Sequence, residues 1–101
     1  LTIASDGTHF VSEDGVGTSL ARRPSARKIM AQLAAAHRER RALDVETLFQ
    51  AGWPGDKVRE PYRSNRVYVL IAKLRSAGLG AALLHDGEGY RLDPDAAIVF
   101  T

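Results

Sequence analysis

The sequence predicts a mixed α+β protein in which a small antiparallel β-sheet (residues 1–22) precedes three helices (24–79) and a β-hairpin (81–93). Three observations predict this order. Two Asp-Gly dipeptides divide the first twenty residues into short β-prone runs. Three segments with apolar residues at helical spacing follow, and a third Asp-Gly pair then separates two short strand-like segments. A chain of 101 residues fits one domain with a single core.

The N-terminal sheet is expected to be a meander of three short strands. Its strands are predicted at 1–4, 8–12 and 16–20, and Asp6-Gly7 and Asp14-Gly15 form the turns between them. These strands hold too little apolar surface to be stable alone. We therefore expect the sheet to pack against the helices.

The first helix is predicted from Pro24-Ser25 to about Arg38. Proline suits the first helical turn, and the serine hydroxyl can cap the helix. Basic residues near the helix end interact favourably with the helix dipole. A histidine at the end of the buried stripe is expected to be partly buried rather than a metal ligand. The residues that form this stripe are Ala26, Ile29, Met30, Leu33, Ala34 and His37.

A second, short helix is expected over 45–51, with Asp44 as its N-cap. Gly52 is expected to end it in the left-handed conformation, which places Trp53 in hydrophobic contact with Leu48. The tryptophan is therefore predicted to be core. The other core residues expected from this helix are Val45 and Phe49.

The third helix is expected to begin after Ser64 as N-cap and to end at Gly78, following a loop over 54–63. Its outer face is predicted to carry short side chains between cations, a profile that suits a helix pressed into a DNA groove. An ordinary solvent-facing side is the other interpretation. The predicted inner residues are Val67, Leu70, Ile71 and Leu74, and the outer ones are Asn65, Val69, Ala72 and Ser76, edged by Arg66, Lys73, Tyr68 and Arg75.

The predicted hairpin pairs residues 81–85 with 89–92 around the turn 86–88, and Asp93-Pro94 ends it. A last apolar strand over 97–100 is expected either to close the sheet or to lead to a neighbouring domain.

Charge is unevenly distributed, although the formal net charge is only +2. Residues 1–20 contain three acids and no Lys or Arg, whereas 22–41 contain seven Lys or Arg against one acid, and 57–75 contain six against one. Such segregation can form a positive face for a polyanion. Solvated helix faces are the alternative explanation.

The composition argues against several other classes of protein. Cysteine is absent, which removes disulfides and thiolate chemistry. No apolar run is long enough for a bilayer, and the N-terminus lacks signal-peptide features, so a cytoplasmic location is expected. The start at Leu1, directly in strand-like sequence, suggests excision from a longer chain. His9, His37 and His85 lie in different elements without metal-ligand spacing, and no catalytic motif appears, so neither enzyme activity nor a metal or cofactor is expected.

Three sequence segments support a family resemblance. NRVYVLIAKLRSAGL followed at a fixed distance by GEGYRL, together with the upstream VETLFQAGWPG, resembles the winged-helix DNA-binding output domain of OmpR/PhoB-type transcription regulators. The resemblance covers nearly the whole chain. It implies a DNA-binding domain whose recognition helix, residues 64–77, enters the major groove of double-stranded DNA.

The resemblance also implies a set of DNA-binding residues. Those on the recognition helix nearest bases and phosphates are Asn65, Arg66, Val69, Ala72 and Lys73, with Arg75 near the backbone. The wing places Arg91 in an adjacent minor groove, and the loop 54–63, which ends at Arg63, corresponds to a segment that contacts RNA polymerase or adjoins DNA.

The chain departs from the family pattern at two places. Asp86 and Glu88 make the wing tip acidic, which opposes DNA by Coulomb repulsion. Val69 and Ala72 are apolar on the reading face, where they can touch thymine methyl groups or form a patch for a protein. The alternative function is therefore a winged-helix protein–protein interaction domain that does not bind DNA.

Overall fold

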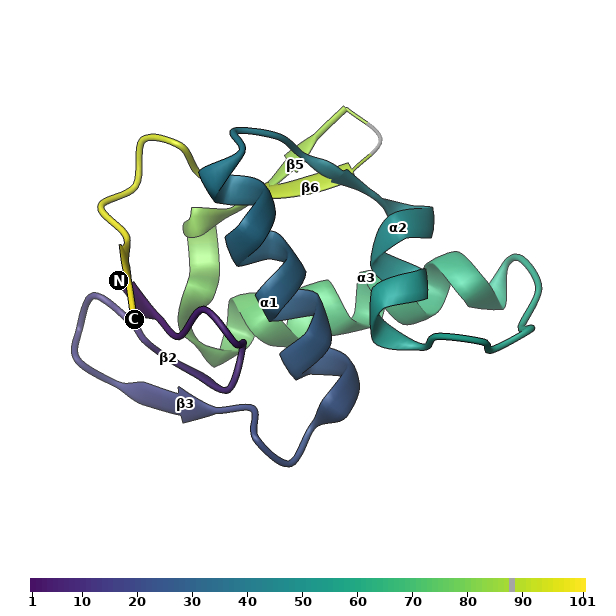
Figure 1. Ribbon diagram of the computed structural model, residues 1–101, viewed down its shortest axis with the longest axis horizontal. Coiled ribbons are helices and arrows are strands. Elements are labelled where there is room, and N and C mark those ends of the chain that lie inside the picture. The colour runs from purple at the N-terminus through teal and green to yellow at the C-terminus, as the bar shows by residue number, and fades with distance from the viewer. Residues whose placement is uncertain (88) are drawn as a thin grey trace.

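The computed structural model describes residues 1–87 and 89–101. Figure 1 shows α1 crossing the molecule, with the N-terminal strands on one side, α2 on the other, α3 running behind it, and the hairpin β5–β6 at one end. The predicted α+β class is confirmed, and the arrangement is compatible with a winged helix. The elements are β1 (Thr2–Ile3), β2 (His9–Val11), β3 (Gly17–Ser19), α1 (Pro24–Arg38), β4 (Leu43–Asp44), α2 (Val45–Gly52), α3 (Tyr62–Leu74), η1 (Arg75–Leu79), η2 (Gly80–Ala82), β5 (Leu83–Asp86), β6 (Gly89–Leu92) and β7 (Val99–Phe100).

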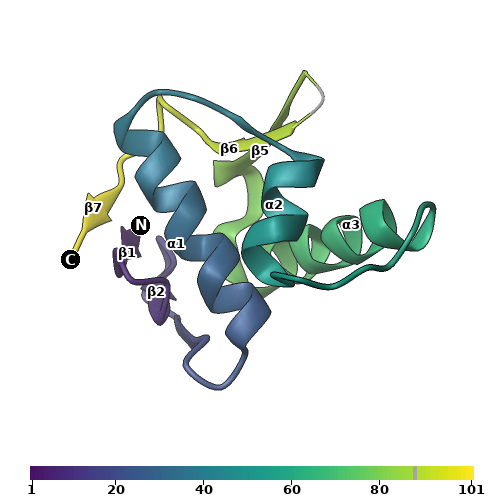
Figure 2. The same ribbon diagram turned by 45° about the vertical axis from the view of Figure 1, so that its right-hand side comes forward.

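The N-terminal sheet has the strand order β3-β2-β1-β7. The first three strands form the predicted antiparallel meander, and β7 joins parallel to β1 with Thr2 opposite Val99. The last strand therefore closes the N-terminal sheet, one of the two outcomes expected. Ile3 and Phe10 are fully buried and attach the sheet to the helices. Figure 2 shows this sheet beside α1, across from α2.

Helix α1 has the predicted bounds, Pro24–Arg38, but not the predicted cap. Its N-cap is Arg23, and Ser25 forms no capping hydrogen bond. Proline at the first helical position starts the helix with its fixed φ. The predicted stripe is buried apart from His37, which is partly buried and lies 5.4 Å from the ring of Phe100.

Helix α2 begins as predicted, because the Asp44 carboxylate accepts a 2.7 Å hydrogen bond from the backbone N–H of Thr47. The prediction for Gly52 was wrong, since this glycine lies within the helix and not in a left-handed cap. Glycine is needed at this position because α1 and α2 meet there, and a Cβ would lie 2.8 Å from Cδ1 of Ile29. Trp53 is partly buried and stacks on Phe49 at 5.4 Å.

Helix α3 begins at Tyr62, and its N-cap is Pro61, three residues before the predicted N-cap Ser64. Ser64 is therefore not the N-cap; its hydroxyl donates to the Glu60 carboxylate at 2.6 Å. Two prolines and a glycine suggested a loop up to Arg63, but proline also favours a helix start, and Pro61 is the N-cap. Regular helix ends at Leu74, and a wider turn continues to Leu79.

The C-terminal hairpin joins a second sheet of order β4-β6-β5. The pairing of β5 with β6 confirms the predicted hairpin but not all of its bounds. The first strand begins at Leu83, because Ala81 and Ala82 belong to η2, and Asp86 pairs with Gly89 instead of lying in the turn. Glu88, which was predicted at the tip, lies outside the described residues. Strand β4, which the sequence did not predict, pairs antiparallel with β6. Gly89 permits this pairing, because a Cβ there would lie 2.1 Å from the carbonyl oxygen of Leu43.

One hydrophobic core joins the helices to both sheets, with residues such as Phe10, Met30, Phe49, Ile71 and Leu92 in contact within a single cluster. Val67 and Leu74 are buried as predicted, whereas Leu70 is only partly buried at the edge of the core. Among the described residues, none of the helices has both the length and the apolar character required to cross a bilayer.

Candidate nucleic-acid interface

The outer face of α3 is the centre of the candidate site. Burial of Val67, Ile71 and Leu74 fixes the rotation of the helix about its axis. Successive residues of an α-helix are about 100° apart around its axis, so the residues on the side opposite these three face solvent. The exposed residues of this face are Asn65, Val69, Ala72, Lys73 and Ser76, as the helical periodicity predicts.

Arg66 is at the edge of this face and has an acidic partner. Its Nη1 lies 2.7 Å from the Asp56 carboxylate, and its guanidinium is 5.9 Å from the ring of Trp53. The hydrogen bond from Arg66 is the main reason that the pKa of Asp56 is lowered. Because the Arg66 side chain is 40% exposed, this ion pair is weak and a phosphate can compete for the guanidinium.

Arg63 has contacts within the protein that hold α2 to α3. Its Nε donates to Glu46 at 2.8 Å, its Nη2 makes a second hydrogen bond to the same carboxylate, and its Nη1 donates to the Val58 carbonyl at 3.2 Å. The guanidinium also lies 3.9 Å above the Phe49 ring. Its side chain is only 17% exposed. Arg63 therefore has a structural role, because its guanidinium is bonded within the protein.

Arg75 connects α3 to the wing. Its Nε and Nη2 donate to the carbonyl oxygen of Leu83 at 3.0 and 2.9 Å, and its guanidinium lies 5.7 Å from the ring of Tyr90. Both neighbours belong to the second sheet, Leu83 to β5 and Tyr90 to β6. The predicted backbone contact of Arg75 with DNA would thus have to be made by a side chain already used to hold the wing.

Arg91 lies on the wing but does not extend from it, since its side chain is 17% exposed. Its Nη1 is 3.4 Å from the Asp86 carboxylate, and its Nε is buried without a hydrogen-bond partner in the described part of the chain. The structure therefore separates the eight predicted site residues into an exposed group on α3 and the internally bonded Arg63, Arg75 and Arg91.

Two hollows lie on one side of the α3 face. The larger, about 320 Å³, is lined by side chains of α3 together with Trp53 at the end of α2. The smaller, about 160 Å³, lies between α3, β3 and the start of α1. Leu70 and Lys73 line both, so the two hollows are adjacent. Arg23 also lines the smaller one; the basic run 22–41 contained it, but periodicity could not place it beside α3.

No group of three His, Cys, Asp or Glu side chains within residues 1–87 and 89–101 is arranged to hold a metal ion. No protein-family model matches this chain, and neither a curated protein nor a solved structure matches it significantly.

Proposed function

We propose that this chain is the double-stranded DNA-binding domain of a cytoplasmic transcription regulator, with α3 seated in the major groove. The observation that carries the proposal is the profile of the α3 outer face. Asn65, Val69 and Ala72 present short side chains at its centre, while Arg66 and Lys73 present cations along one edge. Short side chains allow the helix axis to approach base edges, and edge cations meet phosphates.

The chemistry of each residue suggests a different contribution. Asn65 carries an amide that can bond an adenine edge in bidentate fashion, and Val69 and Ala72 offer apolar contact to thymine methyl groups. Lys73 is exposed, and no ion pair joins it within the described residues. It supplies affinity that does not depend on base sequence, because a neutralised phosphate releases counterions.

The test is binding to random duplex DNA, followed by selection for an enriched motif. We expect salt-dependent binding that weakens for the Arg66→Ala/Lys73→Ala variant, and loss of motif preference for Asn65→Ala with little change in salt dependence. Binding that is absent from mixed-sequence duplexes even at low ionic strength would refute the proposal.

A protein-docking function is the second candidate, and the exposed aromatic residues of α3 favour it. Tyr62 is 70% exposed and Tyr68 is 48% exposed, and both line an open hollow of about 520 Å³ with Glu60 and Pro61. Tyrosine is enriched at protein interfaces. Under this function, Tyr68→Ala would abolish binding to a protein partner that Lys73→Ala leaves intact, and duplex DNA would not compete.

A further inference from the structure

The cations on the two sides of the α3 outer face differ in their contacts within the protein. On the wing side, Arg75 and Arg91 are bonded internally and Asp86 is exposed. On the other side, Arg66 and Lys73 line hollows next to the helix face. A duplex lying across α3 presents phosphates on both sides. Within the described part of the chain, only the side away from the wing has cations that line a hollow next to the helix face.

The loop between β3 and α1 adds two more cations to that other side. Arg22 and Arg23 are exposed, and no ion pair joins either one within the described residues. Arg23 lines the same hollow as Lys73, together with Thr18 and Ser19 of β3. Figure 1 shows this loop at the opposite end of the molecule from the wing, with α3 between them.

Local hydrogen bonds hold this loop in place against α3. The Thr18 hydroxyl donates to the carbonyl oxygen of Ala77 in η1 at 2.9 Å, which joins β3 to the end of the helix. The N–H of Arg23 donates to the Leu20 carbonyl at 2.9 Å and closes the turn. Proline at position 24 then starts α1 directly. These contacts fix the backbone that carries both arginines relative to α3.

We infer that Arg22 and Arg23 form a second phosphate-binding element, which with Lys73 holds one DNA backbone on the side of α3 opposite the wing. The inference rests on the proposed DNA-binding function and specifies where the polyanion lies. The start of α1 adds to the favourable field, because its first turn contains no acidic residue and helix N-termini attract anions. The arginines carry the argument, since they supply full charges beside an exposed lysine.

The first test measures how duplex affinity depends on salt for the wild type and for Arg22→Gln/Arg23→Gln. The slope of log affinity against log salt changes by about 0.9 for each phosphate contact. We therefore expect the slope of the double variant to be smaller by roughly 0.9 to 1.8. Circular dichroism checks that the variant is folded, and the single change Arg23→Gln provides a milder second variant.

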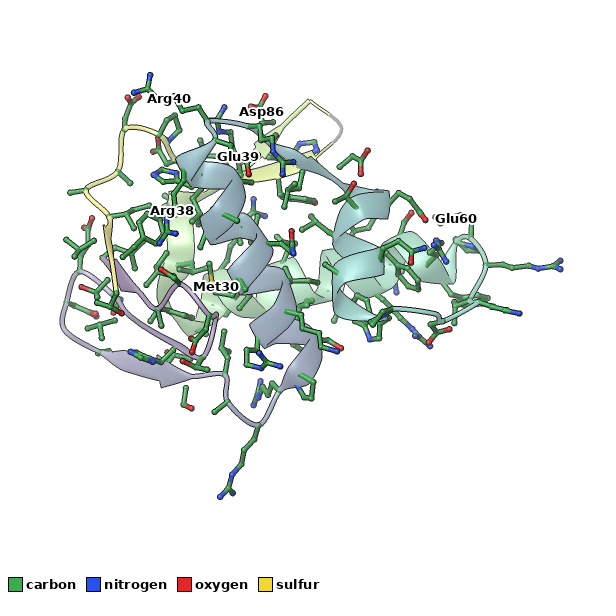
Figure 3. All side chains as sticks on the ribbon, in the orientation of Figure 1. Met30, Arg38, Glu39, Arg40, Glu60 and Asp86 are labelled. Carbon is green, nitrogen blue, oxygen red and sulfur yellow. The ribbon has the colours of Figure 1, made fainter. Side chains whose placement is uncertain are left out.

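The matched control is Arg40→Gln/Arg41→Gln, which removes the same formal charge at the other end of α1. Figure 3 shows Arg40 toward the same end of the molecule as Asp86 of the wing, and Arg40 lines a hollow together with Arg91. Since α1 has 15 residues, its two ends are roughly 22 Å apart. The inference is supported if the control has the same slope as the wild type while Arg22→Gln/Arg23→Gln has a smaller one.

A second measurement locates the DNA directly. Because the natural chain has no cysteine, Ala21→Cys can carry a tethered iron chelate whose radicals cleave nearby DNA backbone, with Ala35→Cys on an exposed part of α1 as control. Stronger cleavage from position 21 supports the inference. The inference is overturned if the wild type binds duplex DNA, the slope of Arg22→Gln/Arg23→Gln is unchanged and cleavage is equal from both positions. The proposed function would then still stand. Absence of any wild-type binding at low salt refutes both.

Discussion

Arg75 donates two hydrogen bonds to a single acceptor, the carbonyl oxygen of Leu83, at 3.0 and 2.9 Å. The first residue follows α3 and the second begins the wing, so this contact sets the wing against the helix. The arginine belongs to the segment for which the family resemblance predicts contact with DNA. Its geometry makes it a bridge between two parts of the candidate interface.

Replacing Arg75 with Gln is expected to lower the free energy of unfolding by about 1 to 3 kcal/mol, because it removes charge-assisted hydrogen bonds and leaves the Leu83 carbonyl without them. Urea unfolding provides the measurement. The control is Lys73→Gln, an exposed cation of α3 on the side away from the wing, whose stability is expected within about 0.5 kcal/mol of wild type. If Arg75→Gln unfolds like the wild type but reduces the salt dependence of DNA binding, Arg75 contacts phosphate and is not the bridge described here.

The Glu46–Arg63 pair predicts a specific dependence of stability on pH. Hydrogen bonds from Arg63, and then from Gln50, lower the pKa of the Glu46 carboxyl from 4.5 to about 2. A carboxyl with a depressed pKa stabilises the fold above its unfolded pKa, and this contribution is lost as the pH falls through the folded value. The loss should therefore occur between about pH 4.5 and pH 2.

Thermal unfolding across that pH range tests the pair. Glu46→Gln has no carboxyl at this position, so its stability should change less steeply with pH than that of the wild type. Glu13→Gln, an exposed acid without an ion pair in the described structure, is the control and should retain the wild-type slope. Identical slopes for the wild type and Glu46→Gln would contradict the role assigned to Arg63.

Asp56 is expected to weaken DNA binding by occupying Arg66. Asp56→Asn removes the negative charge but keeps an amide oxygen that can accept the hydrogen bond from the Val58 N–H. We predict about a 2- to 5-fold gain in duplex affinity at low salt, the size expected from a surface ion pair. Fluorescence anisotropy measures it.

The control for that change is Asp14→Asn in the β2–β3 turn, which alters net charge equally but lies in the N-terminal sheet. A gain of equal size for both variants would mean that net charge matters and the release of Arg66 does not. A loss of affinity for Asp56→Asn would mean that Asp56 positions Arg66 productively.

Gly89 should tolerate no side chain, because a Cβ there would lie 2.1 Å from the backbone oxygen of Leu43. Backbone atoms cannot rotate away as a flexible side chain can. Gly89→Ala is therefore expected to lower the free energy of unfolding by about 1 to 3 kcal/mol or more, the range for overpacking. Gly17→Ala in β3, where nothing lies within 4 Å of the added Cβ, is the control for urea unfolding. Equal stability of the two variants would show that β4 does not pair with β6.

Local sequence signals predicted most of the elements. Asp44 marked the start of α2 because a carboxylate at that position bonds the helix N–H groups, and the Asp-Gly pairs marked the turns. The same signals misplaced the start of α3, where Ser64 has the right chemistry for a cap but lies inside a helix begun by Pro61. Strand β4 was missed because two residues carry no periodicity.

By itself, the sequence determined the order of the elements and which face of α3 is exposed, since both depend on spacing and capping along a continuous stretch of chain. Only the tertiary structure decided which cations of the candidate interface have partners within the protein. Arg63 meets Glu46 from another helix, Arg75 meets Leu83 of the wing, and Arg23 is brought beside Lys73. A long arginine side chain takes its partners from residues distant along the chain, which periodicity cannot specify.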